Sequence, residues 1–120
     1  METAANRKVA LFPFNGEMTC FVHVLLNALD MADKGYEVGI AVEGAAVKLI
    51  PALAKEDAPM HALYKKTKER GLFFGACKAC SHMLGVLDAV QAEGFTLLAD
   101  MSGHAGMAGY MDRGYTIITF

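Results

Sequence analysis

The sequence contains no run of Lys or Arg with interleaved aromatic residues, and its formal net charge is -2. A groove for nucleic acid normally needs such a basic surface, so we expect no nucleic-acid partner. No apolar stretch is long enough to span a membrane. The polar segment Met1–Arg7 precedes only a short strand-like stretch, which is unlike a secretory signal. We therefore expect a cytoplasmic protein without a membrane span.

The sequence also lacks a Gly-x-Gly-x-x-Gly or Walker pattern, so nothing predicts a nucleotide, and we expect no cofactor. Asn15-Gly16 could turn backbone N–H groups toward an anion, although a simple turn is the favoured interpretation. The three cysteines are an odd number, which is a poor match to a disulfide framework. Cys77 and Cys80 lie three residues apart, which suits functional thiols in a reducing compartment.

Apolar residues are abundant: they make up 54% of the chain, and the mean hydropathy is +0.30. For a short soluble chain this predicts apolar surface that contacts a partner subunit. The segment 18–33 has helical spacing of Met18, Phe21, Val22, Leu25, Leu26 and Leu29, while Cys20, Val24 and Met31 occupy its other side. We therefore predict a homo-oligomer that covers this helix.

Hydrophobic periodicity and turn residues predict alternating strands and helices. The expected strands are 8–12, 37–42, 72–76, 95–98 and 115–120. The expected helices are 18–33, 60–70 and 83–93, with a short helix or turn at 43–50 that Pro51 ends. The alternation predicts one α/β domain over residues 1–120, with a parallel sheet covered on both faces and functional groups at the carboxyl ends of its strands.

Cys77 follows the third expected strand and precedes a helix, so it lies where parallel sheets carry functional groups. A helix N-terminus and nearby cations favour the reactive thiolate, and Lys78 and His82 are close in sequence. We interpret Cys77 as a reactive, partly exposed thiol, with a buried inert cysteine as the alternative. His82 could accept a proton or act as a local cation, or it could be an ordinary surface residue.

Cys80 admits three interpretations: one half of a redox dithiol, one half of a zinc site, or an incidental neighbour of a single working thiol. Zinc would need two further ligands, and Cys20 with His23 is the only similar pair, so we predict no metal site. His104 lies in the glycine-rich segment 102–111, next to a strand end. It could reach the same crevice as the cysteines and help to bind a substrate or anion.

The chain resembles the DsrE/DsrF-like family, in particular its small YchN-like members. The resemblance rests on Cys77-Lys78-Ala79-Cys80 after a strand, Asn15-Gly16 in the first turn, the extended 95–98 segment and the terminal strand with Ile117-Ile118-Thr119-Phe120. It implies a three-layer α/β/α fold with a five-stranded, mainly parallel sheet, and assembly into trimers or hexamers. The family often has Arg-Gly where this chain has Leu84-Gly85.

In sulfur-relay members of the family, the cysteine that Cys77 matches accepts sulfane sulfur as a persulfide and passes it to a partner thiol. The resemblance therefore implies a sulfur carrier or sulfurtransferase-like protein with sulfur donor and acceptor proteins as partners. This chemistry needs an activated cysteine and no cofactor. The alternative is a non-enzymatic oligomeric binding or redox-sensing subunit whose cysteines are structural or sensitive to oxidation.

Overall fold

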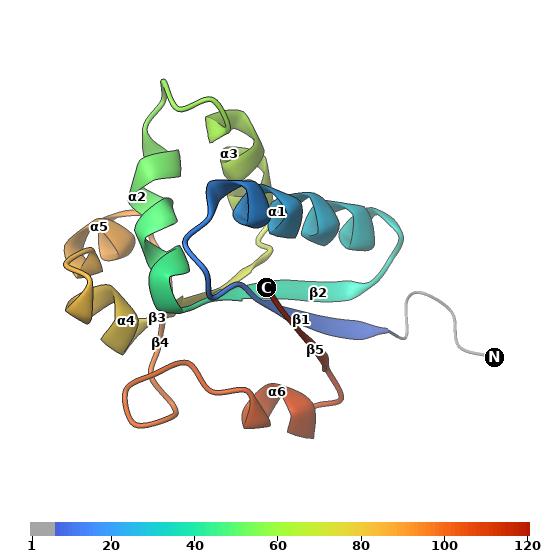
Figure 1. The fold of residues 1–120 in the computed structure, drawn as a ribbon. Coiled ribbons are helices and arrows are strands. Elements are labelled where there is room, and N and C mark those ends of the chain that lie inside the picture. Colours follow the sequence, from blue (N-terminus) through green and yellow to red (C-terminus); the bar gives the residue numbers. More distant parts are fainter. Residues whose placement is uncertain (1–6) are drawn as a thin grey trace.

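The computed structural model describes residues 7–120 and contains a five-stranded parallel sheet. The strands run in the order β4-β3-β2-β1-β5 across the sheet (Figure 1). Their bounds are Lys8–Phe12 (β1), Glu37–Val42 (β2), Phe73–Cys77 (β3), Leu97–Leu98 (β4) and Thr116–Thr119 (β5). The predicted α/β class and parallel sheet are confirmed, and all the pairings are parallel.

Helices cover both faces of the sheet, which confirms the predicted three-layer arrangement (Figure 1). α1, α2 and α3 lie on one face, and α6 lies on the other. The helices are Met18–Asp33 (α1), Leu49–Ala54 (α2), His61–Glu69 (α3), Lys78–Met83 (α4), Leu87–Ala92 (α5) and Ala108–Asp112 (α6), with a 3₁₀ helix, η2, at Gly44–Lys48.

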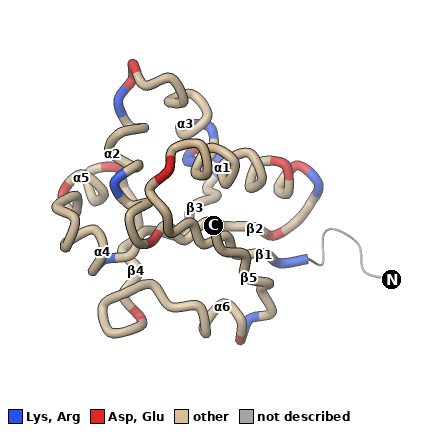
Figure 2. The backbone as a smooth tube through the Cα atoms, viewed as in Figure 1, with Lys and Arg blue, Asp and Glu red and all other residues tan. Residues whose placement is uncertain are grey.

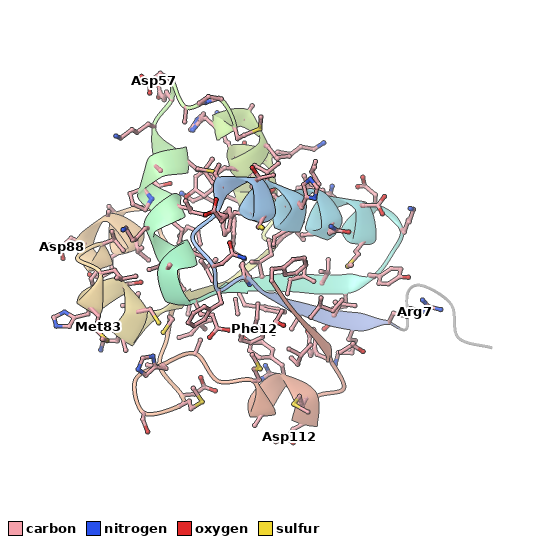
Figure 3. The ribbon with its side chains drawn as sticks, in the orientation of Figure 1. Arg7, Phe12, Asp57, Met83, Asp88 and Asp112 are labelled. Atoms are coloured by element: carbon pink, nitrogen blue, oxygen red, sulfur yellow. The ribbon has the colours of Figure 1, made fainter. Side chains whose placement is uncertain are left out.

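The two faces of the sheet support two separate cores, because successive side chains of a strand point in opposite directions. In β1, Val9 and Leu11 join the larger core with α1, while Ala10 and Phe12 join a smaller core on the α6 side. Phe12, labelled in Figure 3, packs edge to face on Tyr110 of α6. β3 divides in the same way: Ala76 faces the larger core and Cys77 the smaller one.

α1 has the predicted bounds, but its buried face is rotated from the expected one. Val24 is completely buried, so the prediction that it lies on the outer side is wrong. Leu26, expected on the inner face, is 48% exposed. The buried side chains are those that meet the sheet and α3: Phe21, Val24, Leu25, Ala28 and Leu29.

Two predicted helix boundaries are also wrong. Pro51 does not end a helix, because it lies in the first turn of α2, where its missing N–H and fixed φ are tolerated. The segment 83–93 is not one helix. α4 ends at Met83 and α5 begins at Leu87, with Gly85 between them at a φ of +74°. A positive φ interrupts a right-handed helix, and glycine adopts it readily.

Charged residues of both signs are spread over several elements (Figure 2). Within residues 7–120, no helix combines the length and apolar character that crossing a membrane requires. Residues 1–6 lie outside the described residues, so the polar N-terminal segment and the full 1–120 domain boundary remain sequence-based expectations.

Candidate functional site

Cys77 is the last residue of β3 and the residue that precedes α4. It therefore lies at the carboxyl end of a strand, as the sequence predicts. Its side chain is 0% exposed and belongs to the smaller core. The expectation of a partly exposed thiol is wrong for this residue, because it packs in a core with Phe12, Ala105 and Tyr110.

Two polar groups of α4 hold the backbone and sulfur of Cys77. The backbone N–H of Cys80 donates to Cys77 Sγ at 3.4 Å, and the buried Ser81 hydroxyl donates to the Cys77 carbonyl oxygen at 2.8 Å. A buried hydroxyl needs a partner, and this bond supplies it. Sequence reasoning missed Ser81; its signal is a serine four residues after Cys77, one turn along a helix.

A tight turn brings His104 to the cysteines. Met101 and His104 exchange two backbone hydrogen bonds of 2.9 Å each, and the residues between them, Ser102 and Gly103, have φ values of 52° and 89°. Positive φ at both central positions is typical of a type I′ turn. The turn is fixed to α4, because the N–H of Ala79 donates to the Gly103 carbonyl at 2.9 Å.

His104 lies between the two thiols. Its Nδ1 is 3.5 Å from Cys77 Sγ and 3.6 Å from Cys80 Sγ. All three atoms lie within 4.8 Å of one another. The structure thus places His104 in the same crevice as Cys77 and Cys80, as expected for it from the sequence, although it is 27 positions from Cys77.

A hollow of about 400 Å³ lies beside this cluster, and its surface is mostly apolar. Cys80 and His104 line the hollow, whereas Cys77 lies behind them. Met83 is 75% exposed at the hollow and is labelled on α4 in Figure 3. The full lining is Phe14, Glu43, Gly44, Ala45, Cys80, Met83, Leu84, Met101 and His104.

Glu43 is the charged residue of this lining, and sequence reasoning missed it. It directly follows β2, so its position at the carboxyl end of a strand was a usable signal. Burial raises the pKa of the Glu43 carboxyl above its ordinary value. Gly44 follows at a φ of +56°, and a Cβ at this position would overlap the Phe14 ring, so only glycine fits here.

The Cys80 thiol is disfavoured as a thiolate. Burial raises its pKa to about 11, and the hydrogen bond with Cys77 acts in the same direction, while the Gly44 backbone N–H opposes the change. Cys80 is therefore a neutral thiol at pH 7. The partly accessible Cys80 sulfur is therefore protonated, whereas the Cys77 sulfur is covered.

The remaining predicted site residues lie elsewhere. His82 is exposed on α4 and makes no hydrogen bond to either thiol within the described part of the chain. Asn15 accepts a hydrogen bond from the Glu17 N–H at 2.9 Å, which matches the simple turn. Gly16, in the same turn as Asn15, lies close to Ala45 of η2. Cys20 and His23 are exposed on α1, away from the cluster.

The sequence profile of the DsrE/DsrF-like family matches residues 19–120, and the chain belongs to this family. Two archaeal relatives are described only as uncharacterized proteins. One, from Methanocaldococcus jannaschii, is 35% identical over 101 residues, which cover 84% of this chain and 80% of the relative. The other, from Archaeoglobus fulgidus, is 32% identical over 59 residues, which cover 49% of this chain and 95% of the relative.

Proposed function

We propose that this protein is a sulfur carrier that holds sulfane sulfur as a persulfide on Cys77. Membership of the DsrE/DsrF-like family points to a role related to sulfur relay. The observation that carries the proposal is the surroundings of the Cys77 sulfur. It receives the Cys80 N–H at 3.4 Å and has His104 Nδ1 at 3.5 Å, so two groups are available to stabilise a thiolate or a persulfide.

The transfer is a thiol exchange in two steps. The Cys77 thiolate attacks the outer sulfur of a donor persulfide; the donor's S–S bond breaks, and the donor leaves as a thiolate. Cys77 then carries the terminal sulfur. An acceptor thiolate attacks that sulfur and releases Cys77 as a thiolate, so no net oxidation takes place. His104 is placed to accept the Cys77 thiol proton before the first step.

Access to Cys77 requires a local movement, because its side chain is fully covered. Cys80 and His104 separate it from the hollow. Either rotation of the Cys80 side chain or a shift of the turn 101–104 would open a path. We infer that a partner's sulfur-bearing group enters through the hollow.

Cys80 has a separate role in this scheme. Its sulfur lies within 4.8 Å of both Cys77 Sγ and His104 Nδ1. The Cys80 thiol gives its proton to His104, whose Nδ1 lies 3.6 Å from the sulfur, and the Cys80 sulfur attacks the inner sulfur of the Cys77 persulfide; a Cys77–Cys80 disulfide forms and hydrosulfide leaves. A thiol reductant must then restore the two thiols. Without an acceptor, this reaction discharges the carrier.

The proposed partners are a sulfur donor protein and an acceptor protein in the cytoplasm, and the carrier itself is a homo-oligomer, a trimer or hexamer. Four exposed apolar side chains line the hollow: Phe14, Met83, Leu84 and Met101. Apolar side chains around a functional group suit contact with a protein surface.

The test is intact-mass analysis after incubation of the reduced protein with inorganic polysulfide, followed by peptide mapping. We expect a gain of one sulfur on Cys77, no gain on that peptide in Cys77→Ser, and normal loading in the control Cys20→Ser, whose cysteine is exposed on α1. Undiminished sulfur loading in Cys77→Ser contradicts the proposal. Circular dichroism of each variant separates lost chemistry from lost folding.

One observation favours a second candidate, a redox-sensing subunit. The two sulfurs are close enough for a disulfide to form with a small side-chain movement. Hydrogen peroxide would oxidise the two thiols to a disulfide and be reduced to water. A Cys77–Cys80 disulfide formed by peroxide, with no persulfide formed by polysulfide, would favour this candidate.

A further inference from the structure

We propose that Cys77, Cys80 and His104 form a binding site for Zn²⁺ with three protein ligands and an open fourth position. Thiolate sulfur and imidazole nitrogen are the ligands that zinc prefers in proteins. The three donor atoms already lie within 4.8 Å of one another. This inference is independent of the persulfide proposal, since it concerns only the donor atoms and their geometry.

The spacing of the donors matches a tetrahedral ion. With Zn–S of about 2.3 Å and Zn–N of about 2.0–2.1 Å, tetrahedral angles hold a sulfur and a nitrogen about 3.6 Å apart. Nδ1 of His104 lies 3.5 Å from one sulfur and 3.6 Å from the other. An ion between these atoms therefore needs little rearrangement of the S···N distances.

The ligands come from two segments that hydrogen bonds hold in place. Cys77 and Cys80 are joined by the N–H···S bond, and the Ser81 hydroxyl binds the Cys77 carbonyl. His104 ends a turn that is closed by two hydrogen bonds and attached to α4 through Ala79. Such preorganisation lowers the entropic cost of binding.

The hollow leaves room for a fourth ligand, because Cys80 and His104 line it. Three protein ligands with an open position are typical of zinc that binds a water molecule or an external ligand, whereas structural zinc usually has four protein ligands. Binding converts the two thiols to thiolates and releases two protons to the buffer. In the zinc-bound form both sulfurs are occupied, so zinc would block sulfur loading if the persulfide proposal holds.

The experiment uses the reduced, chelator-treated full-length protein, titrated with Co²⁺ as a spectroscopic probe and then with Zn²⁺. We expect one equivalent of Co²⁺ per chain, intense visible bands of a tetrahedral ion, a near-ultraviolet thiolate-to-metal band, and displacement of both by Zn²⁺. His104→Ala should weaken binding by about tenfold or more. Cys77→Ser and Cys80→Ser should each reduce the thiolate band, whereas His82→Ala and Cys20→Ser should bind as the wild type does.

A measurement on the unmodified chain covers the case in which a variant fails to fold. Zn²⁺ should protect Cys77 and Cys80 from alkylation and leave the exposed Cys20 unprotected. An octahedral Co²⁺ spectrum, no thiolate band, or equal protection of all three cysteines would overturn the proposal. Sulfur loading is measured separately on chelator-treated protein, so failure of either proposal leaves the other testable.

Discussion

The ring of Phe74 lies directly over the backbone of Gly39, where any Cβ would overlap it. These residues come from the neighbouring strands β3 and β2. Phe74 also packs on Tyr110 of α6, with ring centroids 4.8 Å apart. The contact therefore links the centre of the sheet to the layer that covers Cys77.

Gly39→Ala should destabilise the protein by about 1–3 kcal/mol, because the added methyl must displace the Phe74 ring. Urea denaturation measures the change. The matched control is Gly109→Ala in α6, where the nearest atom to a Cβ is Asp100 Oδ2 at 3.9 Å and no loss is expected. Equal stability of Gly39→Ala and the wild type would show that the ring moves freely.

Cys80→Ser should keep sulfur on Cys77 for longer. The serine hydroxyl is a poor nucleophile toward sulfur, so the route that releases hydrosulfide and forms a disulfide is lost. Mass spectrometry after removal of excess polysulfide should show a persulfide that outlasts the wild-type one by about tenfold or more, if the Cys80 route accounts for most of its decay. Sulfide release at the wild-type rate would contradict this role of Cys80.

Met83→Gln should slow sulfur transfer from a protein donor by about fivefold, which corresponds to the loss of about 1 kcal/mol of contact. Loading from inorganic polysulfide should not change, because this small donor does not need the apolar rim. Met111→Gln is the control: Met111 is 62% exposed, but it lies on α6 and does not line the hollow. Equal effects of the two substitutions would remove the rim from the proposed interface.

The Glu93→Gln protein should be less stable than the wild type, by an amount that depends on pH. The Tyr64 hydroxyl donates to Glu93 Oε1 at 2.6 Å, and Lys68 Nζ lies 3.0 Å from the same oxygen. The Tyr64 bond, with Lys68 assisting, lowers the pKa of Glu93 below its ordinary 4.5. A lowered folded-state pKa stabilises the protein above pH 4.5, and this contribution is lost as the pH falls through the folded-state pKa.

The difference in unfolding free energy between wild type and Glu93→Gln should thus be largest near pH 7 and shrink on acidification. Urea denaturation at several pH values between 7 and 3 measures it. Tyr64→Phe removes the largest cause of the shift and should reduce the pH dependence. A difference that stays constant over this range would exclude the linkage.

The early part of the fold could be predicted from the sequence, because its signals are local. β1, α1 and β2 have the predicted bounds, since short apolar strands and a 16-residue periodic helix are each set by their own residues. The effect of Gly85 on the helix predicted over 83–93 could not be read from local signals. The apolar spacing of Met83, Val86 and Val90 is typical of one helix, but Met83 faces solvent and the glycine separates two short helices.

The site was only partly predictable for a related reason. The position of Cys77 follows from strand order, and the closeness of Cys80 follows from sequence spacing. The choice between His82 and His104 depends on tertiary contacts: His82 is adjacent in sequence yet exposed, while the turn at Ser102-Gly103 carries His104 back to the thiols. No hydrophobic periodicity in the sequence predicts that this turn brings His104 to the cysteines.

The turn that carries His104 is closed by its own hydrogen bonds, whereas a single backbone bond, from Ala79 to Gly103, joins it to α4. The two cysteines and His104 thus belong to two segments that meet through this bond and through the contacts of the imidazole with the two sulfurs. Because Cys77 and Cys80 lie in one segment and His104 in the other, a change in the separation of the two segments would alter both sulfur–imidazole distances together. One small displacement of the turn would therefore change the contacts of His104 with Cys77 and with Cys80 at the same time.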